Sequence, residues 1–345
     1  MKTAWLNLLA LVAVGVSVVL VVAANLERDH SPDHSIELLN VSYDPTRELF
    51  QDLNQRFETK YQRETGKKIA IQQSHGGSAR QARAVANGLA ADVVTLALFS
   101  DVDTLSKQGL IAPGWSKRLP HESQPWSSTI VFVVRKGNPW NIHDWPDLVQ
   151  RGLLVITPDP NTSGNGKLSV LAAWGSVIHR GGTPAQARDY VQRLFENVPV
   201  LDAGARGAAN TFAGEKTGDV HLTWENEALR EVAGSGGELE LIYPSTSILA
   251  EPRVAWLDTN VAQRHTSEAA KAYLEFLFTQ PAQEIIAAHG YRPIDALILE
   301  KHAATLPKIE LFPVTILAAD WSDAQQKFFG ENGIFNAIPQ RRAKL

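Results

Sequence analysis

The chain has 345 residues, of which 44% are apolar and 20% charged, which is the balance of a globular protein with enough material for two domains. Its formal net charge of −4 lacks the basic surplus of a nucleic-acid binder, so no nucleic acid is expected as a partner. The absence of cysteine excludes disulfides, thiolate metal sites and cysteine nucleophiles.

The N-terminal segment 1–24 is predicted to be a secretory signal peptide. Met1 and Lys2 give a basic start, an apolar run continues to Ala24, and Val22-Ala23-Ala24 offers small residues for cleavage. A polar linker, 25–35, follows. The apolar run is long for a signal peptide, so a retained single-span anchor is the alternative. We expect an exported, periplasmic protein, membrane-anchored if the leader is not cleaved.

After the leader, short apolar strands alternate with tight polar loops and helices. In the first half, strands are predicted over 36–42, 68–73, 91–98 and 129–135, and helices over 44–61, 79–88, 101–108 and 144–151. In the second half, strands are predicted over 153–157, 198–201, 219–224, 239–243 and 254–257, and helices over 167–179, 184–195, 225–232, 267–278 and 281–289. This alternation predicts an α/β fold with mostly parallel sheets.

Two irregular stretches, near 119–128 and 250–256, are the candidate crossings between two lobes. They would place residues 36–120 plus 253–345 in lobe 1 and residues 121–252 in lobe 2.

Four polar loops are each predicted to follow a strand and to precede a helix. They are Tyr43-Asp44-Pro45, Ser74-His75-Gly76-Gly77-Ser78, Thr162-Ser163-Gly164-Asn165 and Gly204-Ala205-Arg206-Gly207. In an open α/β sheet such loops gather at the carboxyl ends of the strands. The first turn of a helix has backbone N–H groups without internal partners, and the helix dipole adds about half a positive charge there. Several helix starts aimed at one point would therefore form an anion site.

Side chains could add further donors to this site. The hydroxyls of Ser78 and Ser163 can donate, and the indole N–H of Trp224, which ends a strand, is a donor and never an acceptor. A site made only of donors suits a fully ionised anion such as sulfate. It should reject protonated oxyanions such as phosphate, because their hydrogen would face another hydrogen.

Taken singly, each of these features has a plainer interpretation. Asp44-Pro45 is typical of a helix cap, Gly76-Gly77-Ser78 of a turn, and Trp224 of a core residue. Arg206 could be a solvated surface charge, or could support its loop or balance the ligand charge. The recurrence of the loops is what favours an anion site.

Several stretches resemble the periplasmic sulfate- and thiosulfate-binding proteins of ABC importers. The matching segments are Leu38-Leu39-Asn40-Val41-Ser42-Tyr43-Asp44-Pro45, Gln73-Ser74-His75-Gly76-Gly77-Ser78, Thr129-Ile130-Val131-Phe132-Val133-Val134-Arg135, Gly204-Ala205-Arg206-Gly207, Trp224-Glu225-Asn226-Glu227-Ala228, Ile248-Leu249-Ala250-Glu251-Pro252 and Tyr291-Arg292-Pro293. The resemblance covers about residues 36–325. It implies a two-lobed periplasmic binding protein fold of type II, in which each lobe is a mostly parallel sheet flanked by helices and the ligand lies in the interlobe cleft. It also implies sulfate or thiosulfate as ligand and the membrane permease subunits of an ABC sulfate importer as partners.

The resemblance also implies a set of ligand residues. These are the backbone N–H groups of Asp44, Ser78, Gly164 and Ala205, the hydroxyl of Ser163 and the indole of Trp224, with Asn165 beside them. His75, Gly77 and Arg206 would support them from behind, with His75 fixing its loop through a ring N–H. Many sulfate binders have Ser-Gly-Gly at Ser163-Gly164-Asn165. The Ser-Gly-Asn form resembles the thiosulfate branch and Trp224 the sulfate branch, so the preferred ligand stays open.

Other functions are weighed against this one. An enzyme is not expected: Ser163-Gly164-Asn165-Gly166-Lys167 lacks the first glycine of a phosphate loop and the Ser or Thr after its Lys, and no G-x-S-x-G or H-E-x-x-H motif occurs. A metal binder would need carboxylates, His or Tyr at the loop tips, so no metal and no cofactor are expected. Molybdate or another tetrahedral oxyanion, and a membrane-anchored anion sensor, remain the alternatives. We expect a monomer.

Overall fold

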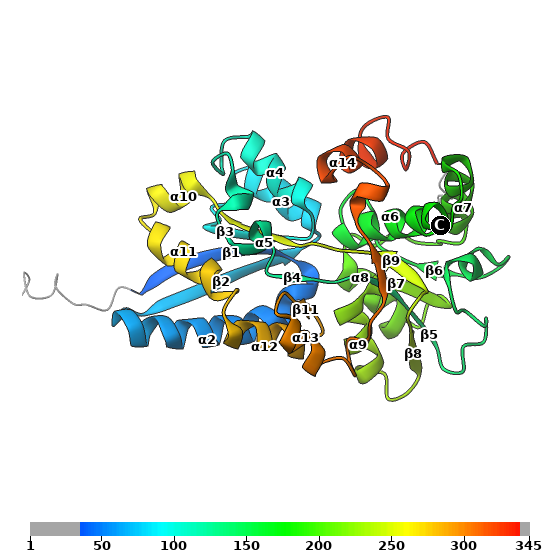
Figure 1. Ribbon diagram of the computed structural model, residues 1–345, viewed down its shortest axis with the longest axis horizontal. Coiled ribbons are helices and arrows are strands. Elements are labelled where there is room, and N and C mark those ends of the chain that lie inside the picture. Colours follow the sequence, from blue (N-terminus) through cyan, green and yellow to red (C-terminus); the bar gives the residue numbers. More distant parts are fainter. Residues whose placement is uncertain (1–34, 339–345) are drawn as a thin grey trace, which may run out of the picture.

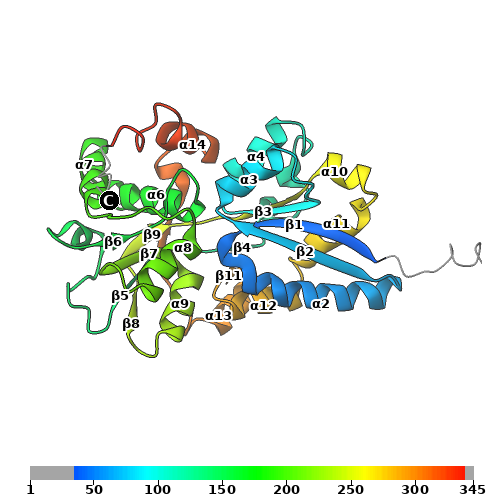
Figure 2. The ribbon, with the colours of Figure 1, turned by 180° about the vertical axis from the view of Figure 1, so that it is seen from behind.

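The computed structural model describes residues 35–338 and has two lobes side by side (Figure 1). The predicted signal peptide and all but the last residue of the predicted linker lie outside the described residues. Lobe 1 is built on a sheet of strand order β10-β3-β1-β2, and lobe 2 on a sheet of order β6-β7-β5-β8. Helices cover both faces of each sheet, as the view from behind also shows (Figure 2).

Lobe 1 follows the predicted alternation closely. In α2, Leu49, Leu53 and Phe57 are buried one turn apart, and Gly66 ends the helix with a positive φ of 71°. The elements are β1 (Ile36–Tyr43), η1 (Asp44–Thr46), α2 (Arg47–Thr65), β2 (Ile69–Gly76), α3 (Ser78–Ala86), β3 (Val93–Leu96), α4 (Phe99–Lys107), η2 (Trp115–Lys117), α5 (Pro120–Ser123), β4 (Trp126–Ser127), β10 (Arg253–Trp256), α10 (Asp258–Gln263), α11 (Ser267–Phe276), α12 (Gln280–Ala288), β11 (Arg292–Pro293) and α13 (Ala296–Lys301).

Lobe 2 packs around α6, whose residues from Gly164 to Ser176 are all buried. The capping box of Thr183 and Gln186 starts the next helix, α7. The elements are β5 (Ile130–Arg135), η3 (Trp145–Val149), β6 (Val155–Ile156), α6 (Gly164–His179), α7 (Pro184–Glu196), α8 (Ala205–Ala209), the π-helical turn η4 (Asn210–Gly214), β7 (Val220–Trp224), α9 (Glu225–Gly234), β8 (Leu239–Ile242), β9 (Thr246–Ile248), β12 (Glu310–Phe312), η5 (Val314–Ile316) and α14 (Trp321–Phe329).

The sheet of lobe 2 is mixed, which corrects the expectation of two mostly parallel sheets. In lobe 1, β1 is parallel to β2 and β3, and β10 alone is antiparallel. In lobe 2, β6 and β7 are parallel, but β5 is antiparallel to both β7 and β8. The reason is the crossing: β5 and β10 both enter their lobe from the other one, so each begins at the edge where its neighbours end. Ile130 accordingly pairs with Trp224, and Arg253 with Leu96.

Two crossings lie in the stretches predicted near 119–128 and 250–256, but a third crossing was not predicted and the first lobe boundary lies later in the chain. Ser128 and Ala250 hydrogen-bond to each other's backbone at 3.0 and 2.9 Å, so two crossing segments are paired where they pass between the lobes. Residues 126–127 still belong to lobe 1, because β4 pairs with β11. A third crossing follows α13, because β12 pairs in parallel with β9 of lobe 2.

The assignment of all of 253–345 to lobe 1 is therefore wrong for its last described part. Trp174 of α6 packs edge-on against Phe328 of α14 at 5.2 Å, and Phe195 of α7 packs against Phe335 at 4.9 Å. These aromatic contacts join the C-terminal segment to lobe 2 (Figure 1), although Ser322 of α14 also hydrogen-bonds to Asp103 of α4 in lobe 1. The strand predicted over 198–201 does not form either: this segment has no strand pairing, although Val155 N–H donates to the Asn197 carbonyl just before it.

Candidate ligand-binding site

The starts of four helices, two from each lobe, meet between the lobes. Lobe 1 brings η1, which begins at Asp44, and α3, which begins at Ser78; lobe 2 brings α6, which begins at Gly164, and α8, which begins at Ala205. All four first residues are buried. Strands β1, β2 and β6 lead into η1, α3 and α6, whereas the loop before α8 follows no strand. The four loops lie together as the loop pattern predicted, although the Gly204 loop does not follow a strand.

Two glycines allow the loops to approach closely. A Cβ on Gly77 would lie 2.4 Å from the Thr162 carbonyl oxygen and 2.9 Å from that of Ala203, both in lobe 2. A Cβ on Gly164 would lie 2.4 Å from the Cβ of Ala97 in lobe 1. Neither glycine has a positive φ, so the lack of a side chain, not backbone freedom, is what these positions require.

The Asp44 loop is held by charge and by a histidine behind it. Arg47 donates to Asp44 Oδ1 at 3.0 Å, and Asp44 Oδ2 faces Gly204, where a Cβ would lie only 2.3 Å away. His75 Nδ1 is 2.8 Å from Ser42 Oγ, so the ring ties the ends of β1 and β2 together. Burial, helped by the nearby Arg47 charge, lowers the pKa of His75 from 6.5 to about 4. The ring is therefore neutral near pH 7.

The Ser163 loop is tied to the strand that ends at Trp224. Ser163 caps α6, with its Oγ accepting from the Gly166 N–H at 3.5 Å. The Asn165 amide donates to the Leu222 carbonyl at 3.0 Å and accepts from the Trp224 N–H at 3.2 Å, so its side chain serves the fold. The Trp224 ring is 1% exposed and packs on Tyr43, the residue before Asp44, at 5.3 Å.

The Ser78 hydroxyl, which the sequence predicted as a possible donor to the ligand, is engaged within the protein. It donates to Asp101 Oδ2 at 2.5 Å and accepts from the Ala97 N–H at 3.0 Å. The hydroxyl is thus committed to lobe 1, and only the Ser78 peptide N–H is left for a ligand. Asp101 also accepts, through Oδ1, from Lys167 of lobe 2 at 3.2 Å.

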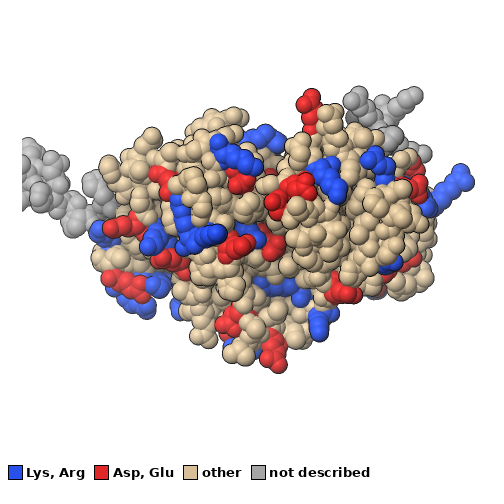
Figure 3. Space-filling view, turned by 45° about the horizontal axis from the view of Figure 1, so that its top comes forward, with Lys and Arg blue, Asp and Glu red and all other residues tan. Residues whose placement is uncertain are grey.

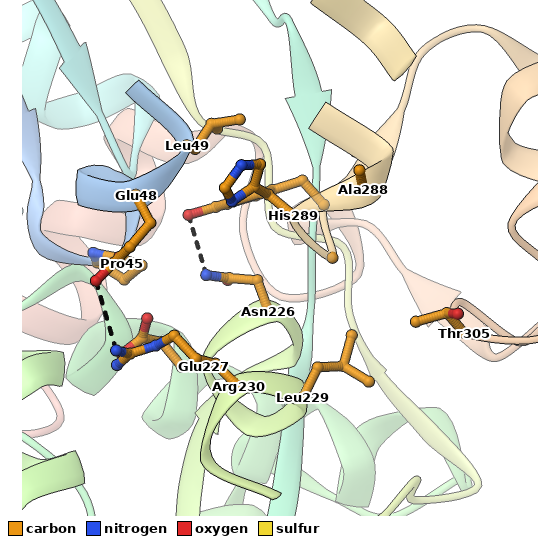
Figure 4. A pocket seen from close by; sticks show the side chains of 12 residues that line it. Pro45, Glu48, Leu49, Asn226, Glu227, Leu229, Arg230, Ala288, His289 and Thr305 are labelled. Carbon is orange, nitrogen blue, oxygen red and sulfur yellow. Dashed lines mark hydrogen bonds and ion pairs between the residues drawn. The ribbon is translucent and has the colours of Figure 1, made fainter. Parts of the chain in front are cut away.

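A second charged cluster joins the lobes beside the site. Arg206 donates to both carboxylate oxygens of Glu48 at 2.9 Å and lies 3.3 Å from Glu227. Arg230 reaches the same two carboxylates, at 3.5 and 3.0 Å (Figure 4). A cavity of about 250 Å³ opens next to them, between the start of α2, α9 and the end of α12. Burial raises the pKa of Glu227 despite the two arginines.

Sequence reasoning placed Arg206 behind its loop, but did not find its partner Glu48 or the Asp101–Lys167 pair. Lys167 carries one signal, because no other Lys, Arg, Asp or Glu occurs in its helix, which is mostly buried. Asp101 and Glu48 carry none, since an acidic residue in the first turn of a helix is normal. These partners are separated by 66 and 158 residues, and nothing local predicts such pairs.

Within the described residues there is no cluster of metal ligands, and one face of the molecule shows no basic patch. Within residues 35–338, no group of three or more His, Cys, Asp or Glu could hold a metal ion. On the face shown in Figure 3, basic and acidic side chains are interspersed and do not gather by sign. No helix in the same stretch of chain is long and apolar enough to span a membrane.

Comparisons with known proteins show the family to which the chain belongs. The family model described as bacterial extracellular solute-binding protein matches residues 38–292. A sulfate-binding protein of Salmonella typhimurium is 48% identical over 308 residues, covering 89% of this chain and 94% of its own. A thiosulfate-binding protein of Pseudomonas aeruginosa is 44% identical over 304 residues, covering 87% and 91%.

Among solved structures, the sulfate-binding protein SubI of Mycobacterium tuberculosis superposes with a TM-score of 0.78 at 29% identity, covering 85% of this chain and 99% of its own. This match confirms the predicted α/β periplasmic binding protein fold. The sequence relatives, matched over nearly their full length, confirm the resemblance seen in the motifs. The chain therefore belongs to the bacterial extracellular solute-binding proteins and, among them, to the family of the sulfate- and thiosulfate-binding proteins.

Proposed function

We propose that this protein captures sulfate or thiosulfate outside the cytoplasmic membrane and delivers it to the membrane permease subunits of an ABC importer. Its family consists of solute-binding proteins, so it is not an enzyme. The names of the relatives support the ligand class, since they are sulfate- and thiosulfate-binding proteins. The predicted leader 1–24 would direct the chain to the periplasm.

The observation that carries the proposal is the meeting of helix starts from both lobes. Ser78, Gly164 and Ala205 lie in first turns, where peptide N–H groups have no partner within the helix. Neutral N–H groups from several helices can replace the water around a dianion, and each helix adds about half a positive charge. Desolvating a dianion is very costly unless it is fully hydrogen-bonded, so closure of the lobes around it is part of the mechanism.

The donor-only character of the site rests on how Asp44 is held. Its carboxylate lies among the loops: Oδ1 accepts from Arg47, and Oδ2 faces Gly204, where a Cβ would lie 2.3 Å away. A protonated phosphate would need a free acceptor here. The proposed ligand-facing set is therefore the peptide N–H groups of Asp44, Ser78, Gly164, Asn165 and Ala205, the Ser163 hydroxyl and the Trp224 indole.

Calorimetry with sulfate, thiosulfate, molybdate and phosphate tests the proposal. We expect tight binding of sulfate or thiosulfate, with phosphate weaker by about 3 kcal/mol or more, because a facing pair of hydrogens leaves buried donors unsatisfied. Equal binding of phosphate, or binding of none of the four, would refute it. Mass spectrometry of the mature N-terminus tests export, and a retained residue 1 would instead support the anchored form.

A further inference from the structure

A buried ion pair joins the two lobes at the candidate ligand site. Lys167 in the first turn of α6 donates to Asp101 Oδ1 at 3.2 Å, and the two side chains are only 5% and 6% exposed. Asp101 lies in the first turn of α4 and also accepts the Ser78 hydroxyl. One carboxylate thus joins the starts of α3 in lobe 1 and α6 in lobe 2.

We propose that Asp101 and Lys167 form a closure latch, an ion pair that is made when the lobes close and that sets how long the bound anion stays. The proposal rests on the proposed function of this site. Removing one partner alone would disfavour closure, because the remaining charge would be buried and uncompensated in the closed state. In an open state both groups would be hydrated, so the latch would add little there.

The pair also positions the ligand loop of lobe 1. With Oδ1 held by Lys167, Asp101 presents Oδ2 to Ser78, and Ser78 in turn accepts from the Ala97 N–H. This chain fixes the first peptide of α3 against the start of α6, where Gly164 lies close to Ser78 and Ala97. Asp101 and Lys167 are therefore positioning residues, which act on the anion through Ser78 and through closure.

The other interlobe ion pairs do not share these properties. Arg206 and Glu48 are 29% and 39% exposed, so solvent screens them in the closed form. Arg292 and Glu225 are buried and bidentate at 2.7 Å, but Arg292 lies in β11 opposite Ser127, next to the paired crossing segments and not in one of the four ligand loops. Among the interlobe ion pairs of the described residues, only Asp101–Lys167 is both buried and located at the ligand loops.

Stopped-flow tryptophan fluorescence on the full-length mature protein tests the latch. Lys167→Met and Asp101→Asn should each raise koff for sulfate about tenfold or more and change kon less than about twofold, since the pair forms after encounter. The double variant, with both substitutions, should have a koff for sulfate no higher than that of either single variant, because it leaves no unpaired charge. Lys167→Arg should restore most of the residence time. Lys216→Met, which removes an exposed pair with Glu238, is the matched control and should change nothing.

The melting temperature without sulfate separates the latch from a general structural role. It should stay within about 2 °C in all variants, because the open form does not need the pair. An unchanged koff in both single variants, additive losses in the double one, or an equal fall in the melting temperature without sulfate would each overturn the latch. Asp101→Asn is nearly isosteric and carries the test if Lys167→Met does not fold. Absence of sulfate binding in the unmodified protein would instead refute the proposed function.

Discussion

Arg206 in lobe 2 and Glu48 in lobe 1 form a bidentate ion pair, with both distances at 2.9 Å. Arg206 directly follows Ala205, the proposed donor residue of α8, and Glu48 lies in the first turn of α2 behind Asp44. The pair therefore connects two of the four converging helix starts from their outer side.

We expect this ion pair to make the free energy of unfolding fall in acid. Its hydrogen bonds from Arg206 lower the pKa of Glu48 from 4.5 to about 2. A lowered folded-state pKa stabilises the protein above the ordinary value, and the contribution is lost as the pH falls from about 4.5 to 2. Both side chains are partly exposed, so the contribution should be only about 0.5–1 kcal/mol. Calorimetric melting at pH 7 and pH 3 should show a smaller acid loss in Glu48→Gln than in the unmodified protein, and an identical loss would contradict this.

Because His75 is neutral near pH 7, we expect the affinity for sulfate to be almost independent of pH in this range. With its pKa lowered to about 4, the ring is neutral throughout, and peptide donors do not titrate. Affinity for sulfate should change less than about twofold between about pH 5.5 and 8.5. The unfolded chain takes up this proton first, so His75 should also cost stability as the pH falls from 6.5 to 4. Titration calorimetry across this range checks the first point; a steep rise in affinity towards acid would show a charged His75.

Gly77→Ala should block closure. The added methyl group would lie 2.4 Å from the Thr162 carbonyl oxygen of the opposite lobe, and a backbone atom there cannot move aside cheaply. We expect sulfate affinity to fall by about tenfold or more, with the melting temperature of the sulfate-free protein unchanged. Gly234→Ala is the control, because a Cβ there meets nothing within 4 Å. Unchanged affinity in Gly77→Ala would mean that the lobes do not close as described.

Ser163→Ala should weaken sulfate binding by about 1–3 kcal/mol, through loss of a charge-assisted hydrogen bond. Because Ser163 also caps α6, the variant should lose about 0.5–2 kcal/mol of folding stability as well. Thr183→Ala removes the cap of α7, remote from the site, and controls for this second effect. Calorimetry that finds equal affinity in Ser163→Ala would remove the hydroxyl from the ligand set.

The sequence predicted the local elements well and their pairing less well. The spacing of Leu49, Leu53 and Phe57 was enough for α2, and Asp44-Pro45 marked the start of its first turn. The segment 198–201 looked like a strand because it is apolar, but no neighbouring strand pairs with it. The direction of β5 depends on which lobe the chain comes from, which no local pattern records.

The sequence by itself determined the helix starts and the residue types at their tips, because caps, glycines and apolar periodicity act over a few residues. These features predict an anion site, whereas the family was recognised from matching segments over about residues 36–325. Only the tertiary structure decided which distant side chains meet: Ser78 donates to Asp101 within lobe 1, and Lys167 to Asp101 and Arg206 to Glu48 across the lobes. Charges this far apart in the chain are brought together by the packing of the two lobes, and a surface acid and a buried partner look alike until that packing is known.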